Sequence, residues 1–248
     1  MAKQKSGGLL ENVKTIVYAG LIAVSIRTIA FEPFNIPSGS MIPTLLVGDY
    51  LFVSKYSYGY SRFSMPFSPN LFEGRIFGRV PDRGDVAVFR WPKDDQTDYI
   101  KRIVGLPGDR VQMRAGQLYI NGALVPRVPA GDFLADDRGL RTMTRRYTET
   151  LPGDEPHSIL KMTDEGSANN TIEYLVPANH VFAMGDNRDN SSDSRFPLQV
   201  GGVGFVPLQN LIGRAEFIFF SIDSRSSWWQ VWQWPFEIRW SRLLHGIT

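Results

Sequence analysis

The chain of 248 residues contains no cysteine. This absence excludes a disulfide framework, a zinc site built from thiolates, a cysteine nucleophile and CxxC redox chemistry. Histidine is also scarce, because only His157, His180 and His245 occur and no H-E-x-x-H motif is present. A multi-histidine metal site is therefore not expected. With so few histidines, a catalytic base has to be sought among other side chains.

Positive charge is concentrated at the N-terminus. The formal net charge is +2, and residues 1–31 contribute +3 through Lys3, Lys5, Lys14 and Arg27 against Glu11. The remaining 217 residues therefore sum to −1. A nucleic-acid-binding protein carries its basic excess on the folded body. The charge pattern predicts no nucleic-acid partner and points to membrane topology.

An apolar segment follows these basic residues. Thr15–Ile26 is uncharged, and the run extends to Phe31 if the long stem of Arg27 is accepted within it. The segment from Thr15 to Phe31 has 17 residues, which is close to the length of about 20 residues that a membrane span needs. Three interpretations compete: a buried core helix, a retained span, and a signal peptide cleaved near Thr28-Ile29-Ala30, which resembles a small-x-small cleavage site.

We favour a single retained transmembrane helix over residues 13–31. The lysines before it predict that residues 1–12 form a cytoplasmic leader. Residues 32–248 are then expected on the other side of the membrane.

The body of the chain is typical of β structure. Short runs rich in valine, isoleucine and aromatic residues are bounded by glycine, proline and aspartate. Asn121-Gly122 between two such runs predicts a hairpin with a type I′ turn. Residues 126–175 are polar and turn-rich, and we interpret them as an insertion between more regular halves. The predicted strands are Val86–Arg90, Tyr99–Val104, Gln117–Ile120, Ala123–Val125, Val176–Met184 and Leu211–Ile222.

The C-terminal tail holds five of the six tryptophans, namely Trp228, Trp229, Trp232, Trp234 and Trp240. Such a group packs in a core or against a partner, or it forms a belt at a membrane interface, where the indole N–H stays hydrated. The preceding membrane segment raises the weight of the second alternative.

The chain contains no complete serine-nucleophile motif of the common hydrolase classes. No G-x-S-x-G elbow occurs, and the S-x-x-K match at Ser158–Lys161 lacks a K-T-G or S-D-N partner, so it is interpreted as chance. In residues 36–45, Ser38 and Ser40 flank Gly39 between two prolines. Taken alone, this peptide is most simply a surface turn.

A serine hydroxyl is a weak nucleophile and needs a base. Strand alternation places Lys101 on one face with Tyr99 and Ile103, where an apolar environment would favour the neutral amine. The simpler alternative is a solvated lysine on an edge strand. A third segment, residues 185–195, is a dense polar loop after an apolar strand, and it fits either turn structure or groups that orient a nucleophile and its base.

Four segments together resemble the type I signal peptidases, membrane-bound Ser–Lys endopeptidases that remove signal peptides from exported proteins. They occur in the family's order and span residues 38–45, 48–59, 99–109 and 185–195. The resemblance implies that Ser40 is the nucleophile and Lys101 the general base. It further implies an oxyanion hole formed by Ser38 and the backbone N–H of Ser40.

The resemblance also assigns supporting roles. Ser191 would orient the Lys101 amine, and Asp193 with Arg195 would brace the loop as an ion pair. Ile42 and Tyr99 would line shallow pockets for small substrate residues at P1 and P3. No metal or cofactor is implied.

The family fold is mostly β: an antiparallel β-sheet catalytic domain with a variable β insertion, preceded here by one transmembrane helix. The resemblance places core segments at about 32–109 and 180–222, the insertion at about 110–180, and a membrane-interfacial tail at 226–248. The implied partners are exported preproteins and membrane phospholipid. The implied location is the inner or plasma membrane, with the catalytic domain in the periplasm or outside the cell.

Two alternative functions are compatible with parts of this pattern. Self-cleaving repressor-type proteases share Ser–Lys chemistry, but the 31-residue apolar N-terminal segment is too short for their DNA-binding domain. A catalytically silent membrane-anchored β-domain would be expected to lack the nucleophile or the base, and both are present.

Overall fold

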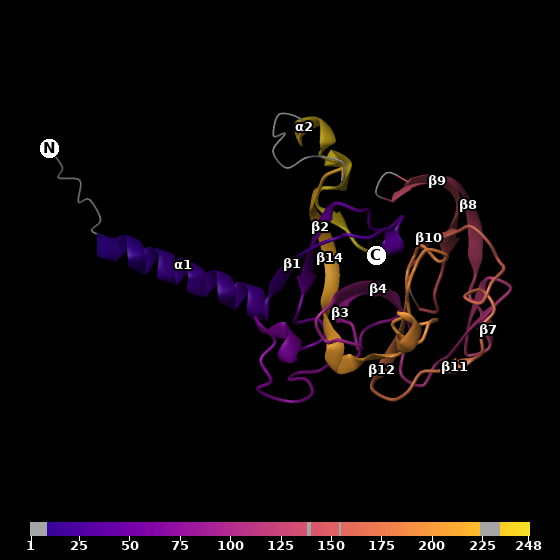
Figure 1. Ribbon diagram of the computed structural model, residues 1–248, viewed down its shortest axis with the longest axis horizontal. Coiled ribbons are helices and arrows are strands. Elements are labelled where there is room, and N and C mark those ends of the chain that lie inside the picture. Colours follow the sequence, from indigo (N-terminus) through magenta and orange to yellow (C-terminus); the bar gives the residue numbers. More distant parts are fainter. Residues whose placement is uncertain (1–8, 138–139, 154, 224–233) are drawn as a thin grey trace.

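The computed structural model describes residues 9–137, 140–153, 155–223 and 234–248. Its longest helix, α1 (Leu9–Ile29), projects from a β-rich body (Figure 1). None of its apolar window is buried, so the interpretation as a buried core helix finds no support. By length and composition, Glu11–Ile29 is a candidate membrane span.

The helix does not keep the predicted bounds of 13–31. It begins by Leu9 and ends at Ile29, because Phe31 already pairs with Ser54 in the first strand. Pro33 favours extended backbone in the residue before it, which is consistent with this early end.

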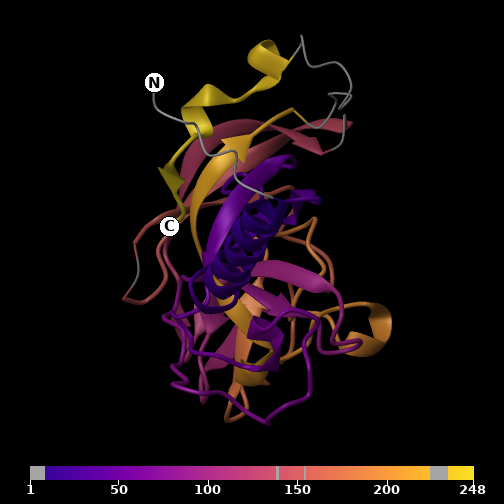
Figure 2. The ribbon, with the colours of Figure 1, turned by 90° about the vertical axis from the view of Figure 1, so that its left-hand side faces the viewer.

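The largest sheet is antiparallel and combines strands from the early and late parts of the chain, which are drawn in purple and orange and lie side by side (Figure 2). Its strands run in the order β1 (Phe31–Asn35), β2 (Asp49–Ser54), β14 (Leu211–Ser221), β3 (Val86–Arg90), β4 (Asp98–Gly105), β12 (His180–Met184) and β13 (Val206–Pro207), with β15 (His245–Gly246) paired to β14. The predicted strand at 86–90 is confirmed at both ends. The strand predicted from Val176 begins only at His180, because Asn179 adopts a left-handed φ of 59°.

Apolar side chains are buried on both faces of this sheet. Val86 and Val88 pack in one cluster, while Ala87 and Phe89 pack in another. This two-sided burial explains why the sequence of β3 is a continuous apolar run rather than an alternation.

A second sheet contains the predicted hairpin. Its strands are β11 (Tyr174–Leu175), β5 (Arg110–Arg114), β6 (Gln117–Ile120) and β7 (Ala123–Leu124). Asn121 and Gly122 both have positive φ, 53° and 79°, as a type I′ turn requires. The hairpin prediction is confirmed, with β7 one residue shorter than expected.

The third sheet lies within the segment that we interpreted as a polar insertion. It contains the long strands β8 (Arg127–Asp137) and β9 (Leu140–Glu149), followed by β10 (His157–Lys161). The pairing of β8 with β9 shifts register between Pro129 and Asp132, next to Gly131 with φ 87°. This irregularity interrupts the alternation of side chains, so the strand has no clear period-2 pattern in its residues.

The C-terminal segment returns to the main sheet. It contains α2 (Trp234–Glu237), and its Arg242 forms an ion pair with the buried Asp49 of β2 at 2.5 Å. Trp240 is 61% exposed, so it does not pack in the core. Trp228, Trp229 and Trp232 lie outside the described residues.

Candidate active site

Ser40 lies in a single turn of 3-10 helix, Gly39–Met41, just beyond β1. Two bonds from Asn187 fix this turn: its side-chain amide donates to Gly39 O at 3.0 Å, and its backbone N–H donates to Ser40 O at 3.1 Å. The serine is therefore held against the 185–195 loop, far away in the sequence.

Lys101 approaches Ser40 from β4. Its Nζ lies 2.7 Å from Ser40 Oγ and 2.8 Å from Ile100 O, and the side chain is almost fully buried. The Tyr99 ring lies 5.4 Å from the same amine. Burial lowers the pKa of the Lys101 amine to about 8, and the carboxylates of Asp193 and Asp186 offset only part of that effect. Near neutral pH the site therefore contains a usable fraction of neutral amine.

The 185–195 loop is closed by the ion pair of Asp193 and Arg195. Two contacts of 2.8 and 2.9 Å join the two side chains, which are fully buried. Burial would raise the pKa of Asp193, but the Arg195 guanidinium holds it below its usual value. Arg195 also donates to Arg188 O, and Asp193 accepts from Gly185 N at 3.1 Å. The pair thus fixes both ends of the loop.

Ser191 is half-buried beside the catalytic pair but does not make the predicted bond to Lys101. Its Oγ is shielded from solvent and makes no hydrogen bond of standard geometry within the described residues, but it lies close enough to Asp193 to help lower the pKa of that carboxyl. The second contact of the Lys101 amine is instead the Ile100 carbonyl. Gly185 is needed here, since a Cβ at that position would collide with the Ser191 side chain and with Ser40 O.

A groove of about 370 Å³ opens over Ser40. Ser38 lies in it, with Oγ 3.5 Å from Ser40 Oγ, and Tyr99 is among the residues that line it. Ile42 does not reach the groove, because its side chain is fully buried against Leu160. The groove is lined by Pro37, Ser38, Gly39, Ser40, Thr97, Asp98, Tyr99, Ile100, Lys101, Asn190 and Ser192.

A second buried ion pair, which the sequence analysis missed, ties the site segments together. Arg102 donates to both oxygens of Asp186 at 2.9 and 2.7 Å, and the Thr44 hydroxyl donates to Asp186 at 2.5 Å. Burial would raise the pKa of Asp186, but Arg102 holds it below its usual value. Arg102 follows Lys101 on β4, so its side chain points to the opposite face. The one sequence feature that could have indicated a role for Arg102 at the site is its position directly after Lys101.

The insertion also supports the loop. Glu149 of β9 accepts from both terminal nitrogens of Arg188, and His157 Nε2 lies 3.5 Å from the same carboxylate. All three side chains are buried, and although burial opposes it, the contacts with Arg188 and His157 lower the pKa of Glu149 to about 2. β10 runs beside the loop, because Leu160 N donates to Asp186 O at 2.8 Å and Arg188 N donates to Leu160 O at 3.0 Å.

The S-x-x-K match at Ser158–Lys161 is not a catalytic pair. Both residues lie on β10, where a spacing of three places them on opposite faces. The Lys161 amine bonds to Asn169 at 2.6 Å and to Asp189 at 3.4 Å. The interpretation as a chance match agrees with this geometry.

A mostly antiparallel β fold with a buried lysine amine against a serine hydroxyl defines a serine hydrolase that uses lysine where others use histidine. The family model for signal peptidases of peptidase family S26 matches residues 9–220. The chain belongs to this family.

Its relatives include signal peptidase I of Rickettsia conorii, 43% identical over 216 residues that cover 84% of this chain and 77% of the relative. Signal peptidase I of Rickettsia bellii is 37% identical over 253 residues, covering 94% and 84% of the two chains. A crystal structure of a signal peptidase I from Enterococcus faecalis is 27% identical, covers 55% of this chain and 97% of its own, and gives a TM-score of 0.31.

Proposed function

We propose that this chain is a membrane-anchored serine endopeptidase that removes signal peptides from exported preproteins, with Ser40 as nucleophile and Lys101 as general base. The observation that carries the assignment is the 2.7 Å contact between Lys101 Nζ and Ser40 Oγ, made by an amine whose charged form is disfavoured by burial. Family membership supplies the substrate class.

The reaction follows from the positions of these groups. Neutral Lys101 takes the Ser40 proton while Oγ forms a bond to the scissile carbonyl carbon. The oxyanion is stabilised by the Ser38 hydroxyl and the Ser40 backbone N–H. The tetrahedral intermediate then breaks its C–N bond, and protonated Lys101 gives its proton to the leaving amine.

The acyl-enzyme on Ser40 is hydrolysed in the second half of the reaction. Lys101 removes a proton from the attacking water and returns it to Ser40 Oγ as the acyl bond breaks. Each half uses the same amine, first as base and then as acid, so the pair requires no metal or cofactor.

We assign the supporting side chains as follows. Asp193 and Arg195 hold the 185–195 loop against the lysine, and Ser191 lies within that loop beside Gly185. Tyr99 lines the groove in which the residues before the scissile bond lie, and small side chains suit its limited volume of about 370 Å³.

The topology that we propose is a retained single span over α1 with a cytoplasmic N-terminus and an extracytoplasmic body. Lysines before the span favour this orientation. Ser40 follows the end of α1 by 11 residues, which reach at most about 40 Å when extended, so the nucleophile stays close to the bilayer surface. Membrane phospholipid is accordingly a proposed partner.

Cleavage of a purified preprotein by the full chain in detergent or proteoliposomes tests the assignment. Ser40→Ala and Lys101→Ala should each abolish cleavage after a small residue without a change in the circular dichroism spectrum. Ser158→Ala is the matched control. Ser158 also lies three residues before a lysine, but the two side chains lie on opposite faces of β10 and cannot form a catalytic pair, so this variant should cleave at the normal rate. Normal turnover in either Ser40→Ala or Lys101→Ala would refute the proposal.

A further inference from the structure

The loop between β2 and β3 exposes an unusual number of apolar side chains. We call residues 65–80 the apolar loop. Isolated exposed apolar residues are ordinary, but a concentration in one segment marks an interaction surface. The exposed fractions are 104% for Phe67, 72% for Leu71, 47% for Ile76, 82% for Phe77 and 53% for Val80.

This loop is fixed beside the end of α1. The Tyr60 hydroxyl donates to Ile29 O, in the last residue of the helix, at 2.8 Å. Tyr60 and Ile76 exchange backbone hydrogen bonds of 2.9 and 2.8 Å. Gly59, with φ 78°, allows this approach, since a Cβ there would collide with Phe77 O. Phe77 therefore occupies a defined position next to the point where the candidate span ends.

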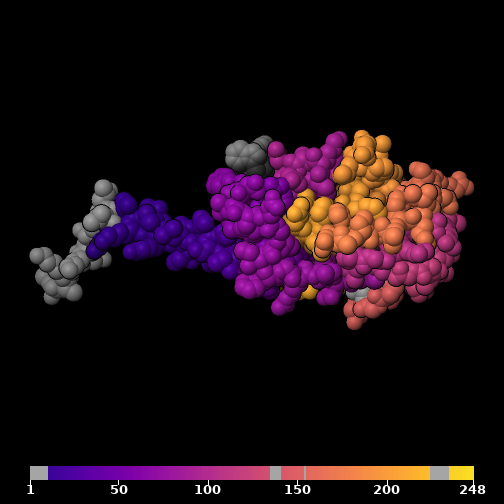
Figure 3. All heavy atoms as spheres, turned by 90° about the horizontal axis from the view of Figure 1, so that it is seen from below, coloured from indigo at the N-terminus to yellow at the C-terminus, as the bar shows by residue number. Residues whose placement is uncertain are grey.

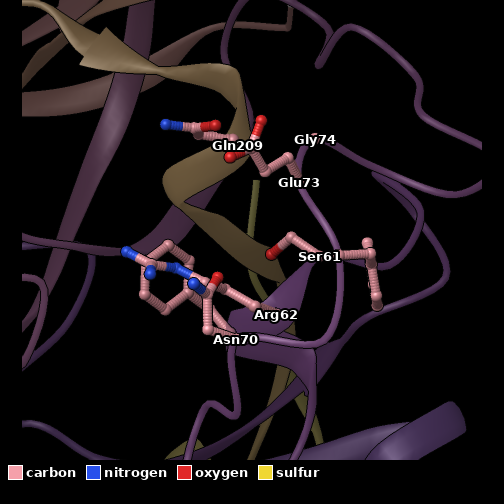
Figure 4. Close-up of a pocket in the computed structure, with 8 residues that line it drawn as sticks. Ser61, Arg62, Asn70, Glu73, Gly74 and Gln209 are labelled. Carbon is pink, nitrogen blue, oxygen red and sulfur yellow. The ribbon is translucent and has the colours of Figure 1, made fainter.

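One charged side chain of the loop, that of Arg75, is directed into the body. The Arg75 guanidinium donates to the carbonyl oxygens of Tyr58, Leu208 and Leu211 at 3.0, 3.0 and 2.6 Å. Beneath the loop lies a polar cavity of about 370 Å³, where Glu73 of the loop lies near Gln209 of the body (Figure 4). With Arg75 held inward, the loop exposes Phe67, Leu71 and Phe77, together with the charged Glu73 and Arg79.

The apolar loop also lies on the side of the body that would face the membrane. In Figure 1 the segment between β2 and β3 lies at the end of the body from which α1 emerges. Figure 3 shows the helix leaving a surface built from these early residues. A bilayer crossed by α1 would therefore meet this end of the body first.

We propose that the apolar loop is a second membrane contact, in which Phe67, Leu71 and Phe77 enter the headgroup region of the bilayer that α1 crosses. This inference rests on the span of the proposed function. Phenylalanine and leucine provide the buried apolar area of an interfacial segment, and the exposed Arg79 suits a lipid phosphate. Two contacts restrict how the body tilts on its helix, and so maintain the height of the groove over the membrane.

The absence of cysteine makes the test direct. Single Phe67→Cys and Phe77→Cys variants of the full chain carry a spin label at one known position each. Their accessibility to oxygen and to a water-soluble nickel chelate is compared in proteoliposomes of phosphatidylethanolamine and phosphatidylglycerol. Ile22→Cys in α1 is the bilayer control. Ile172→Cys is the water control, because Ile172 is 72% exposed on the insertion.

The labels at positions 67 and 77 should show oxygen-to-nickel ratios severalfold above that at position 172. Ratios equal to that at 172, with a lipid-like label at 22, would overturn the loop contact and leave the span intact. A water-exposed label at 22 would overturn the span and the loop contact together. Protection at 67 and 77 only in native membranes, and not in pure lipid, would identify a protein partner and also overturn the proposal.

A kinetic comparison separates this contact from the chemistry. The double variant Phe67→Ser and Phe77→Ser should process a membrane-embedded preprotein severalfold more slowly than the wild type. It should cleave a short soluble peptide in detergent at the normal rate, whereas Ser40→Ala loses both activities. An equal loss on both substrates, or no loss on either, would contradict the role of the loop.

Discussion

Lys101 Nζ lies within 2.7 Å of Ser40 Oγ, although the two residues are 61 positions apart in the chain. Each side of the contact is fixed independently. Ser40 is held by two bonds from Asn187, while Lys101 belongs to a strand paired on both sides, with β3 and β12. A base and nucleophile that are already in contact need little rearrangement before attack, which lowers the entropic part of the barrier.

The rate of cleavage should follow the ionisation of Lys101. Because only the neutral amine acts as a base, and burial lowers its pKa to about 8, kcat/KM should rise about tenfold per pH unit below that value and level off above it. Initial rates on a preprotein between pH 6 and pH 10 measure this profile. A profile without dependence on pH would argue against a lysine base.

The same pKa predicts a pH-dependent contribution to stability. The amine titrates near 8 in the folded chain and near its ordinary value of 10.5 when unfolded, so between these values the unfolded state binds more protons. Stability from this group therefore rises with pH through that interval. From pH 7 to about pH 9.5, the wild type should gain about 2 kcal/mol of unfolding free energy relative to Lys101→Met.

Thermal unfolding of both proteins in the same detergent, at both pH values, measures this difference. Comparison between the variants cancels the titration of the other groups. A constant difference in melting temperature across the range would show that Lys101 is not desolvated.

Local patterns predicted the local structure well. The strand Val86–Arg90 and the Asn121-Gly122 turn were found because their signals lie within a few residues. The long strands of the insertion were missed, since the bulge near Gly131 breaks their alternation. Helix α1 was displaced by two residues at its end because pairing of Phe31 with β2 outweighs the continued apolar run.

The site was predictable to the extent that its residues lie in recognisable segments. Ser40, Lys101 and the Asp193–Arg195 pair came from these segments, and the structure brings them together. The partnerships of Arg102 with Asp186 and of Glu149 with Arg188 join residues 84 and 39 positions apart. No periodicity or spacing rule selects such partners, because tertiary packing decides them.

The Ser38 hydroxyl should contribute to catalysis and not to folding. Ser38→Ala removes one proposed oxyanion donor, so kcat should fall by about 10²–10³ while KM and the melting temperature stay close to normal. Ser192→Ala is the matched control. It lines the same groove, but its hydroxyl bonds to Gly201 O at 2.6 Å, and its removal should change kcat little. Similar kcat values for the two variants would exclude Ser38 from the oxyanion hole.

The buried pair of Glu149 and Arg188 should couple the insertion to the catalytic loop. Glu149→Leu leaves the Arg188 guanidinium buried without its carboxylate, which should cost about 3–5 kcal/mol of unfolding free energy and reduce kcat as the loop loses support. Replacing both partners, Glu149→Leu with Arg188→Met, removes the unpaired charge and should recover most of the stability. Thermal unfolding and kcat are measured for the single and double variants.

Glu173→Leu is the control, since its ion pair with Arg110 is exposed and should be worth less than about 1 kcal/mol. If Glu149→Leu were no more destabilising than Glu173→Leu, the insertion would not support the loop. If the double variant were no more stable than Glu149→Leu, the loss of stability would come from packing and not from the unpaired charge.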